Sequence, residues 1–229
     1  MRNLTVQIDL QEHAAAPVAP NFNRLASLYR WMEWLTFGPA LQRCRTAFIP
    51  HLRNRRQALI LGDGDGRFTA HLLHTNSGIA VDAVDASSGM LFQLARRTAS
   101  SRVRPQLADA RTFQPPRRDY DLIATHFFLD CLANDEVRDL ASELRNYVRP
   151  NAVWIISEFA IPSNSYGRAI ARPLISFLYL AFDILTGLKI RQLPNHRLAL
   201  AQSGWRLAHE QKRLAGLLIS EMWSLDPDF

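Results

Sequence analysis

The residues best suited to ligand chemistry are three glycines separated by single aspartates. Gly62, Gly64 and Gly66 follow the apolar run 58–61 and precede a helical pattern. Glycines let the backbone turn sharply and approach a ligand closely, and a helix N-terminus favours negative ligand groups. The loop therefore predicts a nucleotide-like ligand. Its GxGxG spacing disfavours NAD, because Arg67 stands where the dinucleotide fingerprint GxGxxG needs a glycine or alanine.

Acidic residues follow the next two predicted strands. Asp85 ends the second strand, 19 residues beyond Gly66, where a carboxylate can accept both ribose hydroxyls. Capping of the following helix is the alternative. Asp109 follows the third strand and can accept a hydrogen bond from an adenine amino group, or form a turn.

The end of the fourth strand completes the predicted site, since open α/β sheets bind ligands at the carboxyl ends of their strands. The cofactor-binding residues expected from the sequence are Gly62, Asp63, Gly64, Gly66, Asp85, Ala86, Asp109, Ala110, Thr125, His126 and Tyr29.

Three residues are candidates for proton transfer. His126 and Asp130 lie four apart and can share one face of a helix, and Glu158 ends the fifth strand. A structural hydrogen bond explains His126 equally, and an N-cap explains Asp130. His71 and His74 share a helix but lack a third ligand, so no metal site is expected.

Strands that alternate with helices position these residues. The predicted strands are 58–61, 79–84, 103–107, 120–125 and 153–159, with a final pair, 205–212 and 214–223, close enough to form a hairpin. Pro105 would break a central ladder, so its strand is expected at a sheet edge. The pattern predicts an α/β fold: a Rossmann-like, seven-stranded, mostly parallel sheet with a C-terminal antiparallel hairpin and helices on both faces.

The flanking segments predict a domain organisation. Residues 1–20 form a flexible tail, 21–56 an N-terminal helical lid, in which a second helix starts at Pro39 and the pattern runs to Leu52, and 57–229 the ligand-binding domain. An apolar helical insert, 163–194, interrupts that domain. Charged and proline residues within it argue against a membrane span. It is expected to wall a pocket for an apolar molecule or to form a dimer interface.

Composition excludes several classes. With 48% hydrophobic and 21% charged residues the chain is globular rather than disordered. Cys44 and Cys131 lack the spacing of a zinc site or a disulfide framework, and no apolar signal opens the chain, so a cytoplasmic location is expected, with membrane association as an option. The net charge of +6 alone does not indicate a nucleic-acid partner.

The motifs GDGDG, VDAS, ADA and YDLIATHFFLD, in this order, resemble the class I S-adenosylmethionine-dependent methyltransferases over residues 22–222. The resemblance implies S-adenosyl-L-methionine as cofactor, with the glycine loop at its methionine part, Asp85 at the ribose and Asp109 by the adenine. Ile60 stands where the family often has an acidic residue, and Asp63 or Asp65 is the suggested substitute.

A narrower resemblance is to the ubiquinone/menaquinone C-methyltransferase group. The segments FNRLASLYRWMEWLTFG, RPNAVWIISEFAIP and LAGLLISEMW carry it, although Arg30 stands where that group usually has Asp. Separately, the apolar segment 175–188 is expected to line a pocket for a small, apolar methyl acceptor such as a quinone, polyketide or lipid. A homodimer and peripheral membrane contact are partner options. The alternative functions are an NAD(P)-dependent oxidoreductase and a non-catalytic cofactor-binding subunit.

Overall fold

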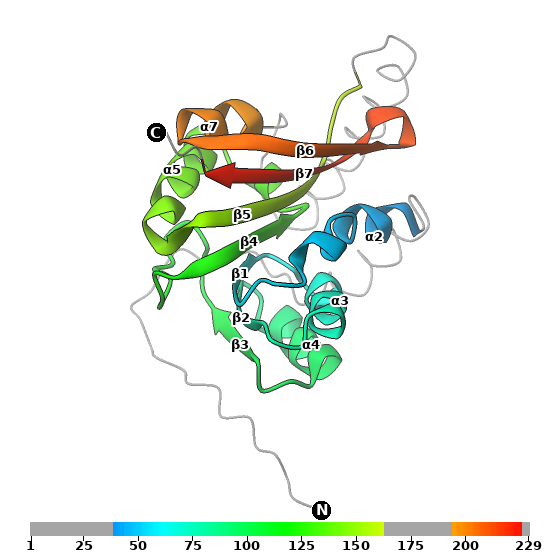
Figure 1. Ribbon diagram of the computed structural model, residues 1–229, viewed down its shortest axis with the longest axis vertical. Coiled ribbons are helices and arrows are strands. Elements are labelled where there is room, and N and C mark those ends of the chain that lie inside the picture. The colour runs from blue at the N-terminus through cyan, green and yellow to red at the C-terminus, as the bar shows by residue number, and fades with distance from the viewer. Residues whose placement is uncertain (1–38, 163–193, 226–229) are drawn as a thin grey trace, which may run out of the picture.

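The computed structural model describes residues 39–162 and 194–225. Seven strands form one sheet in the order β3-β2-β1-β4-β5-β7-β6 (Figure 1). The five strands from β3 to β5 are parallel, and β7 and β6 run antiparallel beyond β5. The predicted fold class is therefore confirmed. The strands are β1 Gln57–Leu61, β2 Ala80–Asp85, β3 Val103–Leu107, β4 Tyr120–His126, β5 Val148–Phe159, β6 Trp205–Arg213 and β7 Leu218–Leu225.

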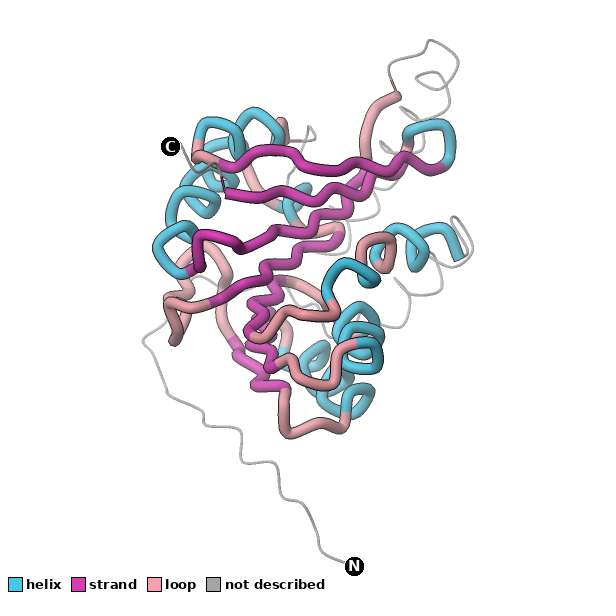
Figure 2. Tube along the Cα trace, viewed as in Figure 1, coloured by secondary structure: helices cyan, strands magenta, loops and turns pink. Residues whose placement is uncertain are grey.

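Helices cover both faces of this sheet (Figure 2). α2, α3 and α4 lie on one face, while α5 and α7 pack together on the other. The α-helices are α2 Pro39–Arg45, α3 Arg67–Thr75, α4 Ser88–Thr98, α5 Asn134–Leu144 and α7 His196–Gln202; single 3-10 turns are η2 Ile49–Leu52, η3 Leu129–Cys131, η4 Arg145–Tyr147 and η5 Leu214–Gly216.

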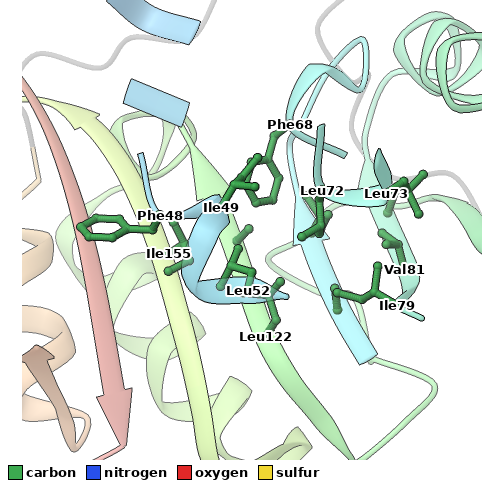
Figure 3. Packing of buried hydrophobic residues seen from close by; sticks show 14 of the residues in the cluster. Phe48, Ile49, Leu52, Phe68, Leu72, Leu73, Ile79, Val81, Leu122 and Ile155 are labelled. Atoms are coloured by element: carbon green, nitrogen blue, oxygen red, sulfur yellow. The ribbon is translucent and has the colours of Figure 1, made fainter. Parts of the chain in front are cut away.

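Alternate residues of each central strand enter different cores. Ile60 of β1 packs with η2 and α3, whereas its neighbours Leu59 and Leu61 pack with α5. Figure 3 shows the first core, in which Ile49 and Leu52 of η2 lie beside Phe68 of α3. Because both faces are covered, residues 58–61 of β1 are apolar in succession rather than alternating with polar residues.

The element boundaries confirm most sequence expectations and correct three. The last strand, expected at 214–223, is Leu218–Leu225, because Leu214–Gly216 form the turn η5. Pro105 lies in β3 at the sheet edge, as predicted. β5 begins at Val148, five residues before the expected start at 153, because Val148 pairs with Tyr120 ahead of a register shift. The helix expected from Pro39 ends at Arg45 and is followed by the separate turn η2.

The segments at the ends of the domain are only partly described. The predicted tail, residues 21–38 of the lid and residues 163–193 of the insert lie outside the described residues. The remaining residues of the predicted lid pack on the sheet, where Leu41 and Cys44 contact Leu217 and Leu218. No helix in the described ranges is long and apolar enough to cross a membrane.

Candidate active site

The glycine loop forms a turn that other residues would strain. Gly62, Gly64 and Gly66 have φ values of 69°, 59° and 80°, in the left-handed region that side chains disfavour. A Cβ on Gly62 would lie 2.4 Å from Cδ2 of Phe128, whereas the nearest atom to a Cβ on Gly64 is Sδ of Met90, at 3.7 Å. Gly64 is therefore the glycine around which the loop has most room.

Asp85 is in direct contact with this loop. Its Oδ2 accepts a hydrogen bond from the backbone N–H of Gly64 at 3.3 Å, and Oδ1 accepts one from Ser87 at 2.8 Å. Ser87, not Asp85, caps α4, because its hydroxyl accepts from the N–H of Met90. Burial raises the pKa of Asp85 to about 6, with Asp63 adding to it while the two N–H donors oppose it. Ala86 beside it is exposed.

The carboxylates suggested as substitutes for an acid at Ile60 already have partners within the protein. Asp63 accepts hydrogen bonds from the backbone N–H groups of Phe68 and Thr69 and from the Thr69 hydroxyl, and so holds the first turn of α3. Asp65 forms ion pairs with Arg67 and Arg97. Ile60 itself is 1% exposed in the core. These contacts give both aspartates a structural task.

The loop after β3 lies beside Asp85. The N–H of Ala108 donates to the carbonyl oxygen of Asp85 at 3.2 Å. The Asp109 carbonyl accepts from Thr112 and Phe113, so the predicted turn is present. Arg111 pairs with the Asp109 carboxylate and lowers its pKa. Ala110 packs partly buried against the core under α5.

The two last residues of β4 point to opposite cores. The hydroxyl of Thr125 accepts a hydrogen bond from Nε1 of Trp154 at 3.0 Å, in the core under α5. His126 lies against Phe68 of α3, with ring centroids 4.3 Å apart. Its Nδ1 contacts Oγ of Ser157 at 2.9 Å, and its buried Nε2 has no partner in the described chain. Burial, with help from the Arg45 charge, lowers the His126 pKa well below its usual value.

The expectation that His126 and Asp130 share a helix face is wrong. His126 ends β4, and Asp130 follows in η3 after Phe127, whose φ is 54°. The alternative N-cap role for Asp130 is also wrong, because α5 is preceded by Ala133, whose N–H donates to Glu136. The β4 strand ends before a helical turn can align the two side chains.

Glu158 connects β5 to the turn after β4. Its Oε1 accepts hydrogen bonds from the N–H groups of Phe128 and Leu129, at 3.1 and 2.8 Å. Its buried Oε2 has no partner in residues 39–162 and 194–225. Burial raises the Glu158 pKa well above its usual value, and the charge of nearby Asp130 adds to the rise. Burial also raises the pKa of Asp130, to about 6.

Phe128 therefore connects Glu158 to the glycine loop. Glu158 holds the backbone of Phe128, and the Phe128 ring occupies the space beside Gly62. The glycine loop, Asp85, His126 and Glu158 thus gather at the carboxyl ends of four neighbouring strands, β2, β1, β4 and β5. Tyr29 lies outside the described residues. Among the residues that are described, no group of three His, Cys, Asp or Glu could hold a metal ion.

Sequence reasoning missed three buried polar residues in this region. Cys44 of α2, Ser157 of β5 and Ser220 of β7 are joined by hydrogen bonds, although 113 and 176 residues separate Cys44 from the two serines. A serine within the apolar part of each strand was the available signal, but it did not indicate which residues would meet.

Comparison with known families and structures agrees with this geometry. Residues 59–154 match the family model described as a methyltransferase domain. A comparison with curated protein sequences finds no match. The matched residues run from β1 into β5 and contain the glycine loop, Asp85, Asp109 and His126. The prediction of a methyltransferase domain is thereby confirmed for this part of the chain.

Solved structures share the fold at low sequence identity. The mitomycin 7-O-methyltransferase has a TM-score of 0.65 and 14% identity, covering 90% of this chain and 60% of its own. An N1-methyltransferase of Burkholderia thailandensis, bound to 1,6-didemethyltoxoflavin and S-adenosylhomocysteine, has a TM-score of 0.61 and 19% identity, covering 93% of both chains. A TehB-like methyltransferase of Corynebacterium glutamicum has a TM-score of 0.59 and 14% identity, covering 89% and 99%. This chain thus spans under two thirds of the mitomycin enzyme and nearly all of the other two.

Proposed function

We propose that this chain is an enzyme that transfers a methyl group from S-adenosyl-L-methionine to a small, apolar molecule. The contact between the Gly64 N–H and the Asp85 carboxylate carries the proposal. This contact joins the glycine loop to Asp85 at the end of the next strand, inside the segment that matches a methyltransferase domain. A solved structure with the same fold holds S-adenosylhomocysteine, which supports the same cofactor here.

The residues present fit the adenosyl group. Each Asp85 oxygen accepts one backbone N–H, which leaves acceptor capacity for two ribose hydroxyls. Gly64 is the least crowded of the three glycines, since a Cβ there would meet only Sδ of Met90, at 3.7 Å. Asp109 and Ala110 follow β3 next to Asp85 and would border the adenine. The assignments of Asp63, Ala86, Thr125, His126 and Tyr29 to cofactor binding remain predictions.

When bound, the cofactor supplies an electrophilic methyl carbon on a positively charged sulfur. The chain's own part is to align the acceptor, exclude water and accept a proton if the acceptor atom carries one. His126, Asp130 and Glu158 are the proposed groups for that proton. Glu158 and Asp130 hold protons more tightly than ordinary carboxyls, whereas His126 holds one less tightly.

The proposed acceptor class rests on similar structures and on the apolar insert. Two of the structures named above are methyltransferases of mitomycin and of 1,6-didemethyltoxoflavin, both small molecules. The apolar insert 163–194 and the lid 21–56 are proposed to enclose an acceptor such as a quinone, polyketide or lipid. We assign the protein to the cytoplasm, in keeping with the free thiols Cys44 and Cys131.

A non-catalytic cofactor-binding subunit is the second candidate function. The buried Ile60, together with the internal partners of Asp63 and Asp65, favours it, because no acid then faces the methionine part of the cofactor from this loop. Cofactor binding without any methyl transfer would support this candidate.

Calorimetry with S-adenosylmethionine and S-adenosylhomocysteine tests the binding, and labelled-methyl transfer to extracted lipids and polar metabolites tests the activity. Heat and label in the lipid fraction are expected. Heat with NAD(H) and none with the adenosyl ligands would overturn the proposal in favour of an oxidoreductase. Light scattering of the purified chain, with and without anionic vesicles, decides between a monomer, a homodimer and peripheral membrane contact.

A further inference from the structure

A buried hydrogen-bond network joins α2 to three strands next to the candidate site. The hydroxyl groups of Ser157 and Ser220 donate to the carbonyl oxygen of Cys44, at 3.2 and 2.9 Å. The Cys44 thiol donates to the carbonyl oxygen of Ile219 at 3.1 Å. Both serines are 0% exposed, and Cys44 is 1% exposed. Water therefore does not compete for these groups.

The network determines which nitrogen of His126 carries the proton. A carbonyl oxygen accepts only, so the contact between Ser157 and Cys44 is a hydrogen bond only if the Ser157 proton points to Cys44. The Ser157 oxygen then accepts from His126, and Nδ1 must be the protonated nitrogen. A proton on Nε2 instead would leave two acceptors facing each other across one of these contacts.

The same assignment leaves Nε2 with a free lone pair. Nε2 is buried and has no partner within the described parts of the chain. Burial and the Arg45 charge lower the pKa of His126, which favours the neutral imidazole. The Phe68 ring, packed 4.3 Å from the imidazole between centroids, limits its rotation. A buried acceptor without a donor is costly unless a ligand supplies the donor.

His126, which carries this lone pair, lies next to the glycine loop. Leu61 of β1 pairs with Thr125 of β4, so Gly62 and His126 follow side by side at the carboxyl ends of neighbouring strands. We infer that Ser157 is a positioning residue that holds His126 with Nε2 ready to accept a proton from an O–H or N–H group of the methyl acceptor. The inference rests on the proposed function and names the acceptor's chemical class as a hydroxyl or amine.

The proton transfer balances with the methyl transfer. As the acceptor oxygen or nitrogen bonds to the methyl carbon, the carbon–sulfur bond breaks and its electron pair stays on sulfur, which becomes neutral. His126 Nε2 takes the acceptor's proton and becomes an imidazolium, which later releases that proton to solvent. Ser157 accepts from Nδ1–H throughout, so the ring does not need to turn.

The tautomer can be measured without a ligand. Two-bond nitrogen–proton correlation spectra of protein labelled with ¹⁵N-histidine, assigned with His126→Gln, are expected to show Nδ1–H with unprotonated Nε2. Ser157→Ala is expected to give a mixture of tautomers, and Ser157→Thr, which keeps the hydroxyl, to restore the wild-type spectrum. Ser220→Ala is the matched control, because it removes a second hydroxyl from the same Cys44 carbonyl without touching His126. Nε2–H or an imidazolium in the wild type would overturn the inference.

Methyl transfer provides the second readout, with labelled S-adenosylmethionine and the lipid and metabolite extracts. General bases typically contribute 10²–10⁴-fold, and Ser157→Ala is expected to lose about tenfold or more in transfer rate at unchanged cofactor affinity. Ser220→Ala is expected to lose less. Equal losses in the two variants would overturn the positioning role. Absent cofactor binding in the wild type would instead overturn the proposed function, and the spectra would still report the tautomer.

Discussion

The proposed cofactor half and the proposed acceptor half of the candidate site satisfy their polar groups in different ways. In the cofactor half, the loop 62–66 and Asp85, the carboxylates of Asp63 and Asp85 are held by backbone N–H groups 2 to 21 residues away. In the acceptor half, His126, Ser157 and Glu158, the partners lie 29 to 113 residues away. Two buried atoms there, Nε2 of His126 and Oε2 of Glu158, have no partner in the described chain.

The difference indicates a division of labour. A local, fully bonded loop can bind the same cofactor in many proteins, because its geometry depends on a short segment. In the proposed acceptor half, Nε2 of His126 and Oε2 of Glu158 can form further hydrogen bonds only with a ligand that carries matching polar groups. Such unpaired buried groups are a usual source of specificity for one ligand over another. Variants in the two halves should therefore fail differently: the first in cofactor affinity, the second in transfer.

The largest effect is expected for Gly62→Ala. The side chain would combine a positive φ with overlap against Phe128, at a cost of about 2–5 kcal/mol of unfolding free energy. Gly64→Ala is the matched control, because its φ is similar but its nearest atom lies 3.7 Å away, so only about 1–2 kcal/mol should be lost. Chemical denaturation measures both, and equal losses would contradict the role given to Phe128.

Glu158→Ala should rank second in stability. It leaves the N–H groups of Phe128 and Leu129 without their acceptor, at about 2–4 kcal/mol. Glu158→Gln keeps a carbonyl oxygen for them and is expected to cost under about 1 kcal/mol, because burial raises the pKa of Glu158 and so favours its neutral form. A glutamine variant as unstable as the alanine variant would show that the native side chain is ionised.

Asp85→Asn should weaken cofactor binding without unfolding the protein. Loss of charged acceptor oxygens toward two hydroxyls corresponds to about 10–100-fold in affinity, measured by calorimetry. Asp109→Asn should lose less, because the Asp109 carboxylate is partly exposed and already paired with Arg111. A larger loss of affinity in Asp109→Asn than in Asp85→Asn would indicate that the protein recognises the cofactor mainly at its adenine.

Cofactor affinity should also depend on pH through Asp85. The ionised form accepts the ribose hydroxyls, and the free protein has an Asp85 pKa of about 6. Below that value the protonated form prevails, so affinity is expected to fall by up to about tenfold per pH unit as the pH drops from 6 to 5, and to level off above 7. Asp85→Asn should remove this slope. A wild-type affinity that is constant from pH 7 to 5 would contradict the assignment.

Thr125→Val should have the smallest effect. It removes the acceptor of the Trp154 indole N–H, at about 1 kcal/mol of stability, and should leave cofactor affinity unchanged. A fall in affinity of more than about threefold would instead support the predicted place of Thr125 among the cofactor-binding residues. The result decides whether Thr125 of β4 contacts the cofactor or only stabilises the core beneath the cofactor-binding loop.

The sequence predicted the cofactor half better than the acceptor half, for a physical reason. Glycine spacing, Asp85 at a strand end and Pro105 at the sheet edge are local signals, and each was found where expected. The predicted relation between His126 and Asp130 failed because it assumed a helix where β4 continues to residue 126. The role of Asp63 in holding α3 was hidden, because a loop aspartate can serve a ligand or a helix equally well.

The contacts of Ser157 and Glu158 could not be foreseen from one sequence. They depend on β5 lying beside β4 and on α2 packing against the first residues of β7, which are properties of the tertiary structure. The early start of β5 has the same origin, because Val148 becomes a strand residue only through its pairing with Tyr120. The half of the site that is expected to select the methyl acceptor is therefore formed by strand pairing between residues that are distant in the sequence.

The order of the strands also bears on how the protein is made. β7 lies between β5 and β6, although it follows both along the chain. While a ribosome is still synthesising residues 218–225, β6 has no neighbour to join, and α2 lacks the strand that contacts it through Ser220. Strand pairs that are distant in sequence also form slowly. The loop 62–66 and Asp85 can therefore assemble during translation, whereas the contact of α2 with Ser220 and the pairing of β6 form only after β7 has entered the sheet.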